Sequence, residues 1–429
     1  MNALLIIIFL VGIVCIAMED KLHVNKAATA LMMAVLSWVV LSAMGSVDDI
    51  SVPFVEQLGE TSETLFFVLG ALTIVELTDS HGGFRVVTQY IRTTDKRKLM
   101  WVLSFMAFVL SALLDNIATA VIIIAILRKM VADRSDRLIF ACMTILAANA
   151  GGSFSPIGDV TTILLYTGGQ VEPMHQIASL ILPSLACMLV PLLIATRFFK
   201  KGEMLGGVNE LKTENDQMPE VSKKSRLIIL FLALLTMISV PIFNEWTHLP
   251  PFMRIMAGVA MLWIYTDVMY GRRGEHSNQV KLPLAQILNR LDLSTILFFL
   301  GVLMTVGALN TSGILVGIGE GLSSAIPNAL GVSATIGVMS SFVDNVALVA
   351  ATQGMYPLAE AGTYAVNSEF WTFLAYCSVT GGSLLIIGSA TGVTVMGMEK
   401  VSFAYYLKKF TPLALAGYIV GGALFILLN

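Results

Sequence analysis

The sequence is poor in charged residues. Asp, Glu, Lys and Arg make up 13% of its 429 positions, whereas a soluble domain has roughly 25%. Hydrophobic residues make up 56% of the chain. They gather in apolar runs whose lengths are close to the about 17–25 residues that a helix needs to cross a bilayer core. This composition excludes an ordinary soluble domain and predicts an all-α polytopic membrane protein.

Cysteine is also scarce, and its placement excludes two further classes. The chain has four cysteines, and each stands alone in an apolar segment, at Cys15, Cys142, Cys187 and Cys377. They form no disulfide framework and no metal-ligand spacing, so we expect small buried hydrophobes. The net charge of −3 argues against a nucleic-acid partner. We expect no cofactor.

Ten apolar runs are candidates for transmembrane helices. The run at 2–18 has no positive n-region and no small-residue cleavage site, so we expect a retained helix rather than a signal peptide. The ten runs are 2–18, 27–44, 62–80, 138–168, 176–196, 227–243, 252–270, 293–312, 370–397 and 410–428. Two more runs, 99–130 and 327–356, carry an Asp-Asn pair near the middle.

The distribution of Lys and Arg indicates that these two runs are re-entrant hairpins. Basic residues favour cytoplasmic loops, and the loops 81–98 and 128–137 on either side of the first run are both basic. A turn near Asp115-Asn116 puts both loops on one side, because each arm reaches only about 22 Å. The run 327–356 has only acidic flanks and predicts a hairpin that opens to the outside. The predicted loops 45–61, 169–175, 244–251 and 313–326 contain no Lys or Arg, whereas the loops 197–226 and 271–292 are basic. This alternation of the two kinds of loop gives ten spans with both termini outside.

Three sequence blocks recur in the same order and predict two inverted repeats. "LLDNIA" (113–118) matches "FVDNVA" (342–347), and "AGGSFSPIGDVTT" (150–162) matches "TGGSLLIIGSATG" (380–392). "FFVLGALTIVEL" (66–77) also resembles "FFLGVLMTVGAL" (298–309). The expected organisation is an N-terminal helix and loop (1–26), a first repeat (27–200), a cytoplasmic linker with a connecting helix (201–251) and a second repeat (252–429).

Polar residues at the two hairpin tips and in two interrupted helices form the candidate site. Gly151, Gly152, Pro156 and Gly158 disfavour continuous helix over 149–162, and Thr380–Gly392 shows a similar interruption. Transporters built from inverted repeats bind their substrate on such broken helices near the membrane midplane. The candidate ion- or proton-binding residues are Asp115, Asn116, Thr119, Asn149, Gly151, Ser153, Asp159, Thr161, Thr162, Asp344, Asn345, Thr380 and Ser383. A second tier contains Glu76, Asp79, His81, Ser389 and Thr391.

These residues suggest a cation substrate. Carboxylate, amide, hydroxyl and carbonyl oxygens are hard ligands that suit Na⁺ or Li⁺, and no Lys or Arg lies in the middle of an apolar run. Burial raises the proton affinity of a carboxylate, and a nearby metal ion lowers it. One carboxylate can therefore hold a proton or a cation in competition. We assign Na⁺ to Asp115, Asn116, Asp159 and Asn345.

Simpler interpretations stand beside these. Asp115 and Asp344 can act only as helix caps, and the Gly-Gly pairs can serve close helix packing. Asp159 can belong to a structural pair, and Thr161 and Thr391 can bond to their own helices. Ordinary polarity at the membrane interface accounts equally well for Glu76, Asp79 and His81.

Four segments together resemble one known family. "TIVELTDSHGGF", "LSALLDNIATA", "ANAGGSFSPIGDVTT" and "SSFVDNVALVAA" are similar to the NhaD-type Na⁺/H⁺ antiporters, which share a superfamily with arsenite permeases and dicarboxylate carriers. The resemblance implies a dimeric bacterial inner-membrane protein that exchanges cytoplasmic Na⁺ or Li⁺ for external H⁺ by alternating access, with an elevator-like mechanism, and serves pH homeostasis. It implies ion or proton roles for Asp115, Asn116, Asn149, Asp159, Thr161, Thr162, Asn345 and Ser383, and also for Asp344 and Thr380.

The leading hypothesis is therefore secondary cation/proton antiport by a protein that is not an enzyme. An anion, carboxylate or arsenite permease of the same superfamily is the main alternative. The carboxylate carriers have Ser-Asn-Thr at their hairpin tips, where this chain has Asp115-Asn116 and Asp344-Asn345. An intramembrane aspartyl protease would need a pair of adjacent carboxylates, and no second catalytic motif accompanies the two aspartates. An ion channel would conduct without proton coupling.

Overall fold

The computed structural model describes residues 2–17, 22–43, 50–83, 93–205, 222–247, 250–271, 284–291, 293–342 and 345–429. Within these ranges the chain is helical and has no β-strand. Seven helices of the described part are long and apolar enough to cross a membrane. The protein is therefore an all-α polytopic membrane protein, as predicted, while the count of ten spans stays a prediction.

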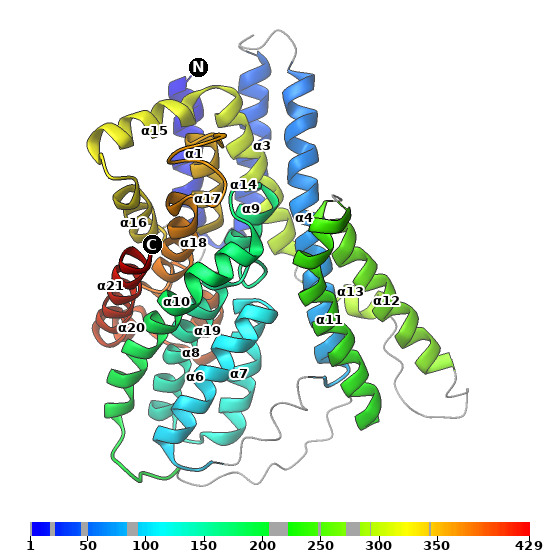
Figure 1. The fold of residues 1–429 in the computed structure, drawn as a ribbon, viewed down its shortest axis with the longest axis vertical. Helices are drawn as coiled ribbons and strands as arrows, with labels where there is room; N and C mark the ends of the chain where they lie inside the picture. The colour runs from blue at the N-terminus through cyan, green and yellow to red at the C-terminus, as the bar shows by residue number, and fades with distance from the viewer. Residues whose placement is uncertain are drawn as a thin grey trace.

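Figure 1 shows the helices in chain order. The first group is α1 (Asn2–Ala17), α3 (Lys26–Ala43), α4 (Ser51–Ser80), α6 (Lys96–Leu113), α7 (Asn116–Met130), α8 (Arg134–Phe154), α9 (Val160–Thr167), α10 (Pro173–Ala195) and the 3-10 helix η1 (Thr196–Phe198). The second group is α11 (Lys223–Thr247), α12 (Pro251–Gly271), α13 (Leu284–Leu288), α14 (Leu293–Thr311), α15 (Ile314–Ala325), α16 (Ala329–Met339), α17 (Asn345–Met355), α18 (Glu369–Gly381), α19 (Ala390–Glu399), α20 (Phe403–Lys409) and α21 (Thr411–Leu428).

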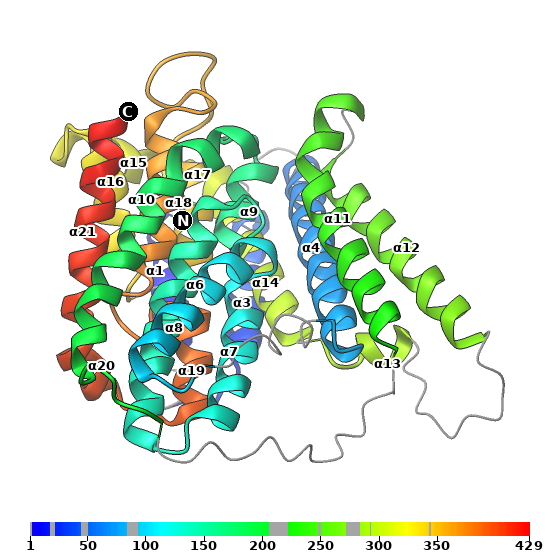
Figure 2. The same ribbon diagram turned by 60° about the horizontal axis from the view of Figure 1, so that its bottom comes forward.

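The helices form two groups in space. Helices α4, α11 and α12 pack against one another and stand to one side of the group that contains α6 to α10 and α16 to α21 (Figure 2). Helix α14 packs against α3, α4 and α17, so it connects the two groups. The predicted repeat boundaries remain predictions, and residues 206–221 of the predicted linker lie outside the described part.

Two helix pairs turn back on themselves near the Asp-Asn motifs. Helices α6 and α7 are joined at Leu114–Asp115, where Asp115 caps α7 by accepting a hydrogen bond from the Ala118 amide at 2.7 Å. Helices α16 and α17 flank the second motif, although Val343 and Asp344 themselves lie outside the described residues. In Figure 1 the α6–α7 pair occupies the lower half and α16–α17 the upper half, each with its turn toward the middle. This arrangement agrees with two hairpins that enter from opposite faces.

Two predicted loops prove to be helical. We expected a loop over 45–61, but α4 begins at Ser51 and adds several turns to the apolar run at 62–80. Glutamate is a good helix former, so the acidic turn that holds Glu56 and Glu60 continues the helix beyond its apolar part. We also expected a loop over 313–326, where the structure has the amphipathic helix α15. It meets α16 at an angle of 114°.

Both interrupted helices exist, but the interruptions are narrower than predicted. Helix α8 continues to Phe154 and α9 starts at Val160, so the break spans 155–159 rather than 149–162. The second break spans 382–389, between α18 and α19. Pro156 explains where α8 stops, because proline disfavours helical backbone in the residue before it. The prediction that Gly151 and Gly152 unwind the chain is wrong, since both lie inside α8.

Gly151 instead permits close packing between helices. A Cβ atom at this position would lie 2.1 Å from the carbonyl oxygen of Phe108 on α6. Gly381 has the same position in the second half, where a Cβ would lie 1.9 Å from the carbonyl oxygen of Gly337 on α16. The Ser111 hydroxyl donates to the Ala148 carbonyl at 2.6 Å, and Ser340 donates to Ser378 at 2.6 Å. These matched contacts support the predicted repeat.

We expect Gly151→Ala to destabilise the protein by about 1–3 kcal/mol, because backbone cannot yield to the added methyl group as a side chain can. Gly59→Ala on α4 is the matched control, since no atom lies within 4 Å of its added Cβ. The control should be neutral or stabilising by up to about 1 kcal/mol. Thermal unfolding in detergent measures both changes. Equal melting temperatures for the two variants would contradict the packing role of Gly151.

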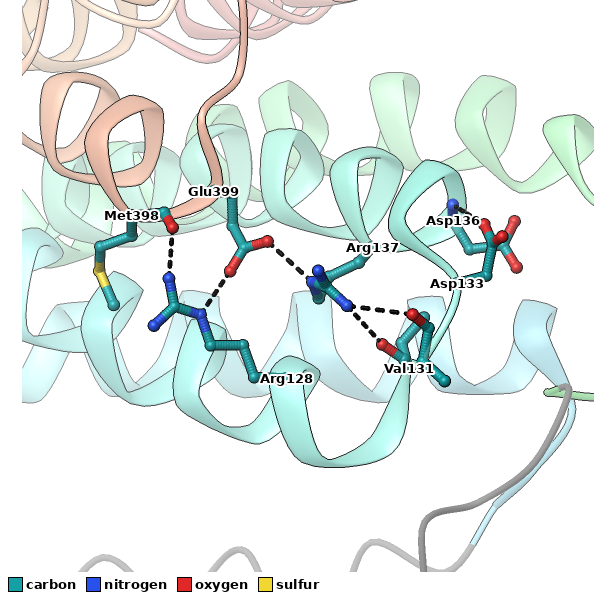
Figure 3. Close-up of polar contacts among 8 residues, drawn as sticks. Arg128, Val131, Asp133, Asp136, Arg137, Met398 and Glu399 are labelled. Carbon is teal, nitrogen blue, oxygen red and sulfur yellow. Dashed lines mark hydrogen bonds and ion pairs between the residues drawn. The ribbon is translucent and has the colours of Figure 1, made fainter.

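An ionic cluster holds one end of these helices together (Figure 3). The buried carboxylate of Glu399, the last residue of α19, accepts hydrogen bonds from Arg128 on α7 at 2.6 Å and from Arg137 on α8 at 2.8 Å. Arg128 also donates to the Met398 carbonyl, and Arg137 donates to the Val131 carbonyl at 2.9 Å. We call these three charged residues the Glu399 clamp. It ties the second broken helix to both ends of the loop that follows the first hairpin.

Candidate ion-binding site

Asp159 lies at the centre of the candidate site. It is the N-cap of α9, where the chain resumes helical structure after the Pro156 break. Its Oδ1 accepts hydrogen bonds from the Thr161 amide at 2.8 Å and from the Thr161 hydroxyl at 2.7 Å. Thr162 completes the capping box, with its Oγ1 accepting from the Asp159 amide at 3.3 Å. The side chain is buried, with 4% of the residue exposed.

The tips of both helix pairs reach this carboxylate. The Asn116 amide, from the first residue of α7, donates to Asp159 Oδ2 and to Asn149 Oδ1, the latter at 3.0 Å. The Asn345 amide, from the first residue of α17, donates to Asp159 Oδ1 at 3.5 Å. Residues that are far apart in the sequence therefore meet on one buried acid. The structure brings together these candidates from both halves of the chain.

Asn149 extends the network to the second broken helix. Its Nδ2 donates to Ser383 Oγ at 2.8 Å and to Ser389 Oγ at 3.0 Å. Ser389 caps α19 by accepting from the Gly392 amide at 3.1 Å, just as Asp159 caps α9. Both breaks therefore end at a capping residue in the same polar cluster. Only the first of these two caps is a carboxylate.

Two candidate threonines on the helices that carry the site residues have buried hydroxyls. Thr119 on α7 and Thr391 on α19 are fully buried, and within the described part of the chain their hydroxyls have no hydrogen-bond partner. Thr391 occupies the position that Thr161 has in the first half, but Ser389 is too short to reach it as Asp159 reaches Thr161. Buried polar groups are normally satisfied by protein, water or an ion. These hydroxyls are therefore available to a transported ion or to water.

Asp115 has a different environment. Its side chain caps α7 and is only partly buried. The structure thus supports the simple capping interpretation for this residue, which does not exclude an additional ionic role. Its counterpart Asp344 lies outside the described residues.

Several predicted candidates make contacts of their own outside this network. Ser153 bonds to the Ala150 carbonyl at 2.8 Å and to the Ser184 hydroxyl at 2.7 Å. Thr380 donates to the Tyr376 carbonyl at 2.6 Å, within its own helix. Gly151 packs against α6, as described above. The contacts described here are structural, and the ion-binding roles of these residues stay predictions.

The acidic group at the end of α4 forms a separate cluster. Glu76 accepts a hydrogen bond from Ser80 at 2.9 Å and lies 3.9 Å from the guanidinium of Arg290. His81 caps the helix with its Nδ1 2.7 Å from the Leu77 carbonyl oxygen, and Asp79 lies on the same turn. These contacts fit a local helix-end network rather than the Asp159 site.

One neighbour of the site was missed in the sequence. The Tyr406 hydroxyl on α20 donates to the Ser383 carbonyl at 2.8 Å and is fully buried. This hydrogen bond holds the backbone of the second break at Ser383, whose hydroxyl accepts a hydrogen bond from Asn149. A tyrosine in an apolar segment gives no signal of such a contact, because its partner is set by tertiary packing.

The donor set suits a hard monovalent cation. Carboxylate, amide and hydroxyl oxygens predominate, and no group of three or more His, Cys, Asp or Glu side chains that could hold a metal is present among the residues that the structure describes. Transition-metal sites need such groups. Among the residues that the structure describes, the network holds one carboxylate, Asp159, surrounded by neutral oxygens, which matches an ion of one positive charge.

Comparison with known proteins places the chain in a family. The citrate transporter family model matches residues 13–373. Sodium/proton antiporter 2 of Arabidopsis thaliana is 39% identical over 97% of this chain and 97% of its own length, and sodium/proton antiporter 1 is 40% identical over 98% and 71%. The Na⁺/H⁺ antiporter NhaD of Vibrio cholerae is 29% identical over 99% of this chain and 91% of its own length. The chain belongs to the NhaD-type antiporter family.

This membership confirms the predicted resemblance. The protein is a transporter and not an enzyme. The two names, citrate transporter and sodium/proton antiporter, correspond to the two transport hypotheses that the sequence raised.

Proposed function

We propose that this transporter exchanges Na⁺, or Li⁺, for H⁺ at Asp159. The observation that carries the proposal is the meeting of one buried carboxylate with the amide tips of both helix pairs, Asn116 and Asn345. Such a carboxylate has a high affinity for a single positive charge because water does not screen it. The names of the relatives, sodium/proton antiporters, agree with this substrate pair.

Competition for one carboxylate supplies the coupling. In the absence of an ion, the Asn116 and Asn345 amides donate to Asp159 and partly compensate its charge. A cation needs oxygen ligands, so its arrival would turn the amide oxygens of these residues toward the site. A proton on Asp159 removes the charge that holds the cation. Release of the cation on one side and of the proton on the other then gives exchange by alternating access.

The origin of the site residues supports an elevator-like movement. Asp159, Asn149, Asn116, Asn345, Ser383 and Ser389 all belong to α7, α8, α17 or the two breaks. None of these six lies on α4, α11 or α12, the group that stands to one side in Figure 2. Movement of one group against the other would carry the whole site. A homodimer, a bacterial inner membrane, termini on the outside and a role in pH homeostasis complete the proposal.

A proteoliposome assay tests the substrate. We expect Na⁺ or Li⁺, added to vesicles that hold an imposed proton gradient and a trapped pH dye, to dissipate the gradient. Citrate added as its choline salt should have no effect, because an anion has no positive partner at Asp159. Citrate uptake by vesicles that ignore every alkali cation would overturn the proposal in favour of the carboxylate carrier. Large currents without proton movement would indicate a channel.

A further inference from the structure

A polar cavity of about 340 Å³ lies between α4, α9, α14 and α17. It is large enough for several water molecules. The polar side chains around it include Gln57, Glu60, Glu63, Gln170, Asn310 and Gln353. The α4 residues that line the cavity belong to the N-terminal half of that helix. This half lies toward the same end of the molecule as α15 and α17, the predicted outer face (Figure 1).

Helices α9 and α17 contribute residues both to the cavity lining and to the candidate site. Leu164 on α9 lines it, five residues after Asp159, and Ala350 on α17 lines it, five residues after Asn345. Five residues of α-helix rise about 7.5 Å. The nearest lining residues on these helices are therefore about one and a half helical turns from Asp159 and Asn345.

The contacts at the two ends of the site differ in strength. Near the cavity, α17 is joined to α9 by neutral hydrogen bonds, from Gln353 Nε2 to Gln170 Oε1 at 2.8 Å and to the Leu164 carbonyl at 3.1 Å. At the opposite end, α7 is joined to α19 by the Glu399 clamp, which is charged and buried. Hydrogen bonds between charged groups are about twice as strong as neutral ones. The contacts that join the helices near the cavity are thus weaker than those of the Glu399 clamp.

The charge of the cavity lining is negative. Glu60 and Glu63 line the cavity from α4, one helical turn apart, while its other polar groups are amides and hydroxyls. Glu56 lies on the same helix but does not line the cavity. Clefts lined by charge of one sign concentrate counterions at their mouths. Such charges can concentrate a cation that keeps its hydration shell, without direct coordination by the carboxylates.

We infer that this cavity is the outer access route to Asp159, and that Glu60 and Glu63 are steering residues that concentrate hydrated monovalent cations in it. The inference rests on the proposed cation exchange, which it extends by assigning an entrance and two residues outside the binding site. These two glutamates do not take part in the exchange at Asp159. They set how much cation reaches it from one side of the membrane.

The double variant Glu60→Gln/Glu63→Gln tests the inference in right-side-out and everted membrane vesicles. We expect the Na⁺ concentration for half-maximal exchange to rise about threefold to tenfold when Na⁺ is supplied on the cavity side, as local steering weakens. It should be unchanged from the other side, and the maximal rate should be retained. Added choline chloride should shrink the difference, because salt screens exposed charges beyond about 3–10 Å.

Glu320→Gln/Glu360→Gln is the matched control, since it removes the same number of charges from exposed residues that do not line the cavity. A shift equal to that of Glu60→Gln/Glu63→Gln would overturn the assignment of the cavity. So would a shift of equal size in both vesicle orientations, or no shift at all. If the wild type exchanges Na⁺ for H⁺ from both sides and Glu60→Gln/Glu63→Gln has the same kinetics, the access route is refuted. The proposed function is then still supported, because exchange itself is observed.

Discussion

Replacing Asp159 by asparagine should abolish Na⁺-dependent proton movement, with a fall in transport rate of about 100-fold or more. Loss of one partner of a buried charge interaction costs about 2–5 kcal/mol, and about 1.4 kcal/mol corresponds to a factor of ten. Asparagine caps helices as well as aspartate does, so α9 should keep its N-terminus. The change therefore removes the charge and the titratable proton while it spares the local fold.

The measurement is the dissipation of a proton gradient by Na⁺ in proteoliposomes that contain equal amounts of each variant. Asp115→Asn is the matched comparison, because it makes the same chemical change at another helix cap. Since the Asp115 side chain caps α7, whereas Asn116 and Asn345 both donate to Asp159, we expect a smaller loss, about tenfold or less. Normal Na⁺-driven proton flux in Asp159→Asn would contradict the assignment. Equal losses in the two variants would show that both carboxylates take part.

Breaking the Glu399 clamp should cause the second large effect. Glu399→Gln leaves two guanidinium groups without their carboxylate, and such a loss in a buried pair costs about 3–5 kcal/mol. The Arg128 side chain is 49% exposed, so water screens part of the effect, and we expect about 3 kcal/mol. The melting temperature in detergent should fall by several degrees. Glu320→Gln, at an exposed glutamate of α15, should leave it unchanged.

The clamp also has a defined pH dependence. Glu399 lies beyond the end of the apolar run 370–397, and burial alone would raise its pKa. The hydrogen bonds from Arg137 and Arg128 outweigh burial and hold the pKa below its ordinary value of 4.5. A lowered pKa gives stability that is complete above about pH 4.5 and is lost as the pH falls through the folded-state value. The gap in melting temperature between wild type and Glu399→Gln should thus be constant from neutral pH to about pH 5 and close below it. A gap that closes near neutral pH would contradict the assignment.

Local patterns were enough to predict much of the fold. The basic loops around 99–127 placed a turn near Asp115, and the structure has it at Leu114–Asp115. The Asp-Asn and Gly-Gly blocks placed both interrupted helices. Their boundaries were set too wide because glycine disfavours helix in isolation, whereas Gly151 and Gly381 serve contacts with α6 and α16. Whether a glycine breaks a helix or lets another approach depends on the partner, which no local pattern contains.

The candidate site, like the fold, could be predicted from the sequence only in part. Sequence patterns identified Asp115, Asp159 and Asn345 as candidates, but they could not rank the two aspartates. The ranking depends on contacts such as Asn345 to Asp159, which joins residues 186 positions apart. The Glu399 clamp spans more than 260 positions and was not foreseen for that reason. Long-range contacts decide which polar residues act together, and they follow from packing.

The difference between the two helix caps has a consequence for leakage. Asp159 caps α9, but its counterpart on α19 is the uncharged Ser389. The moving part of the carrier would thus be neutral at this centre when it holds either one Na⁺ or one proton, and would bear a bare negative charge when empty. An unneutralised acid inside a bilayer costs about 2.5–3.5 kcal/mol, enough to slow the empty carrier's return by about 100-fold. A single carboxylate would in this way make futile cycling rare without any separate gate.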